Sequence, residues 1–83
     1  KLDDLALEKH CKKYVRTDYH PSGTAKMGSD NDKLAVLDSK MRVRGINNLR
    51  VCDLSAVPNI NSGNTSAPAM MLGLRCGDLI LDY

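Results

Sequence analysis

Apolar side chains recur at helical spacing near the start of the chain. Over residues 2–16, LDDLALEKHCKKYVR, the apolar positions follow an i, i+4, i+7, i+8 pattern, which is typical of an amphipathic helix. These positions are Leu7, Cys11, Tyr14 and Val15. Acidic residues precede basic residues along the segment, in the sense that the helix dipole favours. We therefore predict a helix over 2–16, with His10 on its solvated side.

A second segment with helical spacing, residues 67–81, is almost entirely apolar. Its sequence, APAMMLGLRCGDLIL, places Gly73 and Gly77 opposite a narrow charged stripe. Because each glycine costs a helix roughly 1 kcal/mol relative to Ala, we expect another backbone to approach this face closely. Thr65 or Ser66 can cap the first turn. The segment is too short and too charged to span a membrane, so we predict a buried helix packed against a sheet.

Short segments with alternating character lie between these two helices. We predict strands at 34–37 (LAVL), 41–44 (MRVR) and 49–53 (LRVCD), with a further short strand around Tyr19. The turn signal GINN at 45–48 separates two of them and predicts a hairpin. The expected fold class is therefore α/β, with short strands that join a sheet built mostly by residues outside this chain, and a buried C-terminal helix.

Composition indicates a piece of a larger protein. The chain has 83 residues, no Trp, no Phe and three Tyr, so it lacks the usual large core side chains. A free domain of this size is marginally stable. Residues 1–50 hold 11 of the 12 Lys and Arg residues, which favours a solvated first half and a buried second half. The net charge of +2 is weak evidence for a nucleic-acid partner, and we interpret Arg42, Arg44 and Arg50 as solvated or ion-paired.

Three cysteines, Cys11, Cys52 and Cys76, lie far apart along the chain. No C-x-x-C pair occurs, so we predict no metal site. We expect all three thiols to be reduced and two of them to lie in the core. Reduced cysteines weakly favour an intracellular location.

The start of the second helix is the place where chemistry is expected. Unpaired N–H groups at a helix N-terminus favour negative charge, and Asn64 lies beside them. The predicted strand 49–53 ends nearby, at Asp53 and Leu54. Cofactors bind in α/β proteins where strand ends and helix N-termini converge. An ordinary strand, loop and helix fits the same residues, with Asn64 as a cap and His20 as an exposed loop histidine.

Three blocks occur in the order seen in one enzyme family. They are YHPSGTAKMG at 19–28, LRVCDLSAVP at 49–58 and SGNTSAPAMM at 62–71. Together they resemble the C-terminal signature of the glucose–methanol–choline (GMC) oxidoreductases, over about residues 14–82. The sequence departs from that signature at Ala25, at Leu54 and over 74–77, and it contains no G-x-G-x-x-G dinucleotide fingerprint.

The resemblance implies an FAD-dependent alcohol oxidoreductase with two catalytic residues. His20 would accept the proton of the alcohol, for which a neutral imidazole is suited. Asn64, six positions after Pro58, would hydrogen-bond the alcohol oxygen, as in members of the His/Asn type such as choline dehydrogenases. The helix N-terminus would stabilise the charge of the reduced flavin. The cofactor-binding residues implied by the resemblance are Tyr19, His20, Asp53, Leu54, Asn64, Thr65 and Ser66.

The resemblance also implies an organisation and a set of partners. Residues 1–48 would end the substrate-side region, and 49–83 would supply the last strand and helix of the FAD-binding domain. The expected partners are the rest of the parent flavoenzyme and a small alcohol, with no nucleic acid and no membrane segment. The segment alone is expected to be inactive. Two alternatives remain: a lyase or decarboxylase of the same fold, and a standalone binding module without catalysis.

Overall fold

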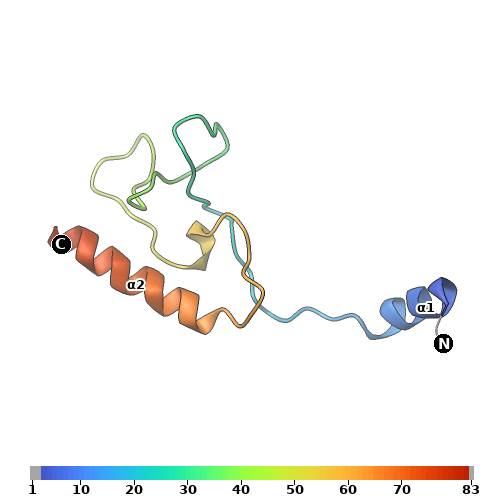
Figure 1. The fold of residues 1–83 in the computed structure, drawn as a ribbon. Helices are drawn as coiled ribbons and strands as arrows, with labels where there is room; N and C mark the ends of the chain where they lie inside the picture. Colours follow the sequence, from blue (N-terminus) through green and yellow to red (C-terminus); the bar gives the residue numbers. More distant parts are fainter. Residues whose placement is uncertain (1–2, 83) are drawn as a thin grey trace.

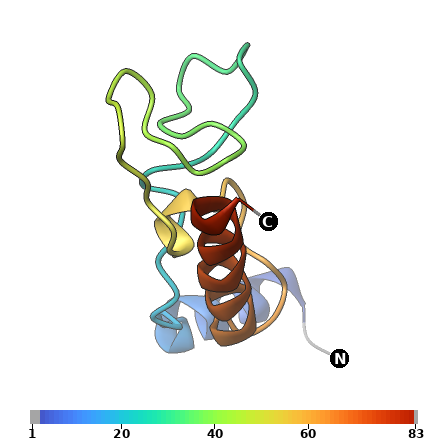
Figure 2. The ribbon, with the colours of Figure 1, turned by 90° about the vertical axis from the view of Figure 1, so that its left-hand side faces the viewer.

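The computed structural model describes residues 3–82, and it shows an elongated chain with a small core. Its elements are helix α1 (Asp4–Tyr14), the 3-10 helix η1 (Leu54–Ala56) and helix α2 (Ser66–Leu81). Helix α1 lies apart at the end of an extended linker, whereas η1 lies beside α2 (Figures 1 and 2). The radius of gyration is 17.5 Å, against about 12 Å for a compact domain of this length.

The first helix confirms the helix predicted from the apolar spacing. The side chain of Asp3 accepts a hydrogen bond from the backbone N–H of Ala6 at 2.7 Å, which caps the first turn. The helix ends at Tyr14, because Val15 adopts an extended conformation. None of its residues is buried, so the apolar face faces solvent. Leu2, the first residue of the predicted helix, lies outside the described residues, as do Lys1 and Tyr83.

The second helix is found where the pattern predicts it, but its predicted burial is wrong. Leu72 and Cys76 are its buried residues, and several large apolar side chains of the helix are more than half exposed. The exposed set is Met70, Met71, Leu74, Ile80 and Leu81. No described atom lies within 4 Å of a side chain built at Gly73 or Gly77, so the expected close backbone approach stays a prediction. Within residues 3–82, neither helix is long and apolar enough to cross a membrane.

The predicted strands are absent from the described part of the chain. The segment pairs instead through isolated bridges, which are Met27 with Leu37, Leu37 with Val43, and Arg42 with Arg50. The predicted hairpin pairing is present, because the N–H of Val43 donates to the carbonyl of Leu49 at 2.9 Å and the turn lies between them. A two-stranded hairpin is at best marginal in water without further strands. The α/β expectation is therefore confirmed for the helices and wrong for the strands.

Arg42 and Arg44 donate hydrogen bonds to other residues of the chain. The guanidinium of Arg44 donates to four backbone carbonyls of the loop 28–35, at distances from 2.6 to 3.3 Å. Arg42 donates from Nε to the carboxylate of Asp38 at 2.7 Å. The guanidinium group is planar and carries five N–H donors, so one Arg side chain can contact several acceptors at once. Arg44 therefore holds the loop together and is half-buried, contrary to the interpretation of a solvated strand residue.

A disulfide joins the middle of the chain to α2. Cys52 and Cys76 are bonded, with Cα atoms 6.0 Å apart, and Cys76 packs with Met41 and Leu72 in the core. Cys11 is free and exposed. The expectation of three reduced cysteines is wrong for Cys52 and Cys76. The intracellular location was inferred from reduced cysteines, so it has no support from them. Residues 24 positions apart meet because the chain turns between η1 and α2, and α2 then runs back past η1 (Figure 1).

Candidate functional site

The loop that carries His20 is attached to η1 by a ladder of backbone hydrogen bonds. The N–H groups of Gly23, Ala25 and Met27 donate to the carbonyls of Leu54, Ser55 and Ala56, at 3.1, 2.9 and 2.9 Å. Gly23 has a φ of +85°, and a Cβ there would lie 3.2 Å from the carbonyl oxygen of Val57. Both facts favour glycine at this position. The ladder places the first sequence block beside the second.

His20 and Asn64 line the same open hollow, which has a volume of about 890 Å³. The hollow is formed by the linker before His20 and by the loop before α2. The side chain of His20 is 20% exposed. The structure therefore brings together the two residues that the sequence analysis paired, although they come from different halves of the chain. The other lining residues are Thr17, Asp18, Tyr19, Pro21, Ile60, Asn61, Ser62 and Gly63.

A carboxylate lies next to the His20 ring. Oδ2 of Asp18 is 3.2 Å from Nδ1 of His20, which is within ion-pair range. Between them Tyr19 has a φ of +55°, and its ring is largely exposed at the edge of the hollow. Asp18 was not among the site residues predicted from the sequence. Its place two residues before His20 was a signal in the sequence, but in an extended linker the two side chains would lie on one face without touching, some 6 to 7 Å apart.

Hydrogen bonds to Ser66 and Asn61 hold Asn64 in place. Its Oδ1 accepts the N–H of Ser66 at 2.9 Å, and its backbone carbonyl accepts Nδ2 of Asn61 at 3.1 Å. Asn64 thus performs the capping bond expected of Thr65 or Ser66, because Thr65 occupies the cap position without a side-chain hydrogen bond. With Oδ1 engaged, the two N–H donors of the Asn64 amide remain for other partners. Asn61 is a bracing residue that the sequence analysis missed.

A second hollow, of about 370 Å³, contains two of the predicted cofactor-binding residues, Asp53 and Leu54. Its other lining residues are Pro21, Ser22, Thr24, Ser55 and Ala69. Asp53 accepts hydrogen bonds from the hydroxyl and the backbone N–H of Ser55, and these bonds hold the pKa of its carboxyl below the ordinary value. Because Pro21 lines both hollows, they adjoin at this residue. Thr65 is buried and Ser66 is exposed, and neither lines either hollow.

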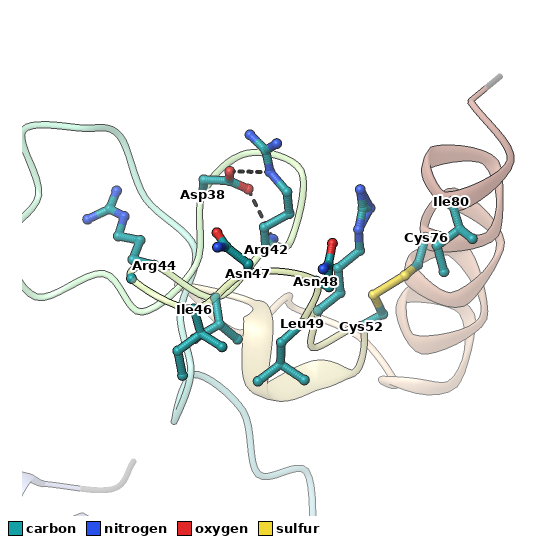
Figure 3. Close-up of a pocket in the computed structure, with 13 residues that line it drawn as sticks. Asp38, Arg42, Arg44, Ile46, Asn47, Asn48, Leu49, Cys52, Cys76 and Ile80 are labelled. Carbon is teal, nitrogen blue, oxygen red and sulfur yellow. Dashed lines mark hydrogen bonds and ion pairs between the residues drawn. A yellow bond between two sulfur atoms is a disulfide. The ribbon is translucent and has the colours of Figure 1, made fainter.

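A third hollow, of about 1130 Å³, is larger than these two, lies elsewhere and contains none of the predicted site residues. Figure 3 shows its rim, with the Asp38–Arg42 pair on one side and the disulfide that reaches α2 on the other. The turn 45–48 supplies much of the remaining lining. Volume alone therefore does not identify the candidate site. Across residues 3–82, no cluster of three His, Cys, Asp or Glu side chains is arranged to hold a metal ion.

Comparisons with known proteins agree with the sequence blocks. The sequence profile of the GMC oxidoreductases matches residues 1–73. An oxygen-dependent choline dehydrogenase of Vibrio vulnificus is 50% identical over 78 residues, and one of Photobacterium profundum is 46% identical over 78 residues. Each alignment covers 94% of this chain and 14% of the relative. An uncharacterised GMC-type oxidoreductase of Mycobacterium bovis is 43% identical over 79 residues, covering 95% of this chain and 15% of the relative.

The chain thus spans about one seventh of the length of the curated relatives it matches. The matched region includes the His20 loop, the η1 turn and the start of α2, which are the parts that form the two adjoining hollows. On this evidence, the chain belongs to the GMC oxidoreductase family.

Proposed function

We propose that this chain is the C-terminal catalytic segment of an FAD-dependent alcohol oxidoreductase. In this proposal His20 accepts the hydroxyl proton of the alcohol, and Asn64 donates a hydrogen bond to the alcohol oxygen. The observation that carries the proposal is that both side chains line one open hollow. The relatives named as choline dehydrogenases make choline the first alcohol to test.

The two side chains suit complementary tasks. A neutral imidazole can take a proton at neutral pH and return it to solvent afterwards. The Asn64 amide adds a hydrogen bond without adding charge, and its oxygen is already engaged by the N–H of Ser66. That bond fixes the side chain so that its N–H groups are the part available to a substrate oxygen. A donor held in advance costs no reorganisation when charge develops on that oxygen.

The residues of the second hollow fit part of an FAD molecule. Ser22, Thr24 and Ser55 offer hydroxyl groups, Asp53 a carboxylate, and Pro21, Leu54 and Ala69 apolar surface. Since this hollow adjoins the one with His20 and Asn64, an elongated cofactor could lie along both. Asp53 and Leu54 would contact the cofactor there, with Tyr19, Thr65 and Ser66 as further candidates. FAD, when bound, would supply the acceptor for the hydride that leaves the alcohol carbon.

The rest of the flavoenzyme would complete the site. The exposed apolar side chains of α2, the elongated shape and the small core are features of a segment that packs against a larger body. The division at residue 48 into a substrate-side part and an FAD-domain part stays a prediction. We expect the 83-residue segment alone to show neither FAD binding nor alcohol turnover.

The test uses the complete flavoenzyme that carries this segment. We expect His20→Ala to lower the rate of flavin reduction by choline at least about 100-fold with FAD retained, because the proton acceptor is lost. Asn64→Ala is expected to lower it about tenfold or more. Stopped-flow absorbance of the flavin measures both rates. His10→Ala, on α1, is the matched control.

Near-normal flavin reduction in His20→Ala would remove His20 from the mechanism. A flavin that is never reduced by any alcohol, although product forms, would indicate a lyase or decarboxylase of the same fold. Turnover by residues 1–83 alone would contradict the view that the rest of the enzyme is needed.

A further inference from the structure

We propose that Asp18 is a positioning residue for His20, an inference that rests on the proposed function. Its carboxylate keeps the ring proton of neutral His20 on Nδ1, which leaves the lone pair of Nε2 to accept the alcohol proton. The observation is the distance of 3.2 Å between Oδ2 of Asp18 and Nδ1 of His20. A partner on one imidazole nitrogen decides which nitrogen carries the proton.

The backbone around Asp18 is arranged so that this contact can form. In an extended strand, side chains two residues apart lie on one face but some 6 to 7 Å from each other. Here Tyr19 takes a φ of +55°, which is uncommon for a residue other than glycine, and this bend brings its two neighbours together. The hydroxyl of Thr17 accepts the N–H of Tyr19 at 3.1 Å and supports the bend.

The residues that line the hollow also support this role for Asp18. The lining residues of the hollow include three with titratable side chains, which are His20, Asp18 and Tyr19. Asp18 is therefore the anion that faces the ring. Asn64 lies across the same hollow, so a ring oriented by Asp18 would be held in the space where the substrate oxygen is expected.

The proton transfers balance without a further reagent. The alcohol O–H bond would break as the N–H bond forms at Nε2, and bound FAD would supply the acceptor for the hydride that leaves the alcohol carbon. His20 becomes an imidazolium with protons on both nitrogens, and the Asp18 carboxylate compensates its positive charge. Asp18 stays ionised throughout and takes no proton.

Because the Asp18 side chain is 92% exposed, the expected effect is moderate. Solvent screens exposed ion pairs strongly, so we expect Asp18→Asn to slow flavin reduction about fivefold in the complete flavoenzyme. FAD content and the dissociation constant of the alcohol should stay unchanged. Asp18→Glu, which restores a carboxylate, should recover most of the loss. Asp30→Asn is the matched control, since Asp30 is exposed and makes no hydrogen bond or ion pair with the described residues.

A second readout is independent of activity. Diethyl pyrocarbonate acylates the unprotonated nitrogen of a neutral imidazole, and trypsin places His10 and His20 on separate peptides because Lys12, Lys13 and Arg16 lie between them. The rate at His20 relative to His10 is measured by mass spectrometry on the complete flavoenzyme at about pH 8, where an ordinary imidazole is neutral. It should fall in Asp18→Asn, because the carboxylate no longer keeps Nε2 as the unprotonated nitrogen, and return in Asp18→Glu.

The outcomes separate this inference from the proposed function. If His20→Ala abolishes flavin reduction while Asp18→Asn reduces flavin at the normal rate, the role of Asp18 is refuted and the proposed function stands. If Asp18→Glu fails to recover what Asp18→Asn loses, the carboxylate is not what matters and the inference is overturned. If His20→Ala itself reduces flavin normally, both fail together.

Discussion

The backbone N–H of Gly23 donates a hydrogen bond to the carbonyl oxygen of Leu54 over 3.1 Å. This bond starts the ladder that places the His20 loop beside η1 and its cap residue Asp53. The two sequence blocks that the ladder joins, 19–28 and 49–58, would otherwise be separate loops. The relationship between Gly23 and Leu54 is therefore the main local reason why the two hollows adjoin.

Replacing Gly23 should weaken this arrangement. Gly23→Ala introduces a side chain at a φ of +85° and 3.2 Å from the carbonyl of Val57, so we expect a loss of roughly 1–2 kcal/mol in the free energy of unfolding, with weaker FAD retention. Gly45→Ala is the matched control, because Gly45 has a φ of +79° but open space around it. Urea unfolding followed by flavin release measures both variants. Equal losses would show that the Val57 contact is unimportant.

Removal of the disulfide should destabilise the attachment of α2. Cys52 and Cys76 close a loop with a sequence separation of 24, for which chain entropy gives about 3 kcal/mol of stabilisation. We expect Cys52→Ser and Cys76→Ser to lower the thermal midpoint by similar amounts, and Cys11→Ser to have little effect. A non-reducing peptide map checks the bond directly. Finding both cysteines as free thiols would contradict the pairing.

Substitution of Gly73 distinguishes an exposed helix face from a covered one. In the 83-residue chain no described atom approaches this position, so Gly73→Ala should raise helix stability by about 1 kcal/mol, seen as greater helical circular dichroism. In the complete flavoenzyme the same variant should lower the thermal midpoint if another backbone packs there. Stabilisation in both settings would argue against close packing at Gly73.

Acid should weaken the folded state through three aspartates. The hydrogen bond from Lys26 lowers the pKa of Asp32, and the bonds from Ser55 lower the pKa of Asp53. Partial burial acts to raise the pKa of Asp38, but hydrogen bonds from the backbone and side chain of Arg42 outweigh it, so this pKa is also lowered.

A depressed carboxyl pKa stabilises the folded state above the ordinary Asp value near 4, and this stabilisation is lost as the pH falls through the depressed values. We expect the free energy of unfolding to be flat near neutral pH from these groups and to drop below pH of about 4. Asp38→Asn should reduce that drop, whereas Asp30→Asn should not. Urea unfolding at neutral pH and at about pH 3 compares them. An unchanged drop in Asp38→Asn would show that its bonds to Arg42 do not contribute.

Local pattern was sufficient for the helices and for the identity of the candidate residues. The spacing of Leu7 and Cys11, and the apolar run after Pro68, predict α1 and α2 to within a few residues, because helical hydrogen bonds join residues four apart. The sequence blocks around His20 and Asn64 pointed to the family that the comparisons support.

Tertiary structure decided everything that joins distant parts of the chain. Strands at 34–37 and 49–53 did not form because a strand needs partners that the described residues do not supply. The Cys52–Cys76 bond, the shared hollow of His20 and Asn64, and the approach of Asp18 to His20 depend on loop closure and on one left-handed residue. Such contacts depend on how the whole chain folds, which the spacing of residue types along the sequence does not determine.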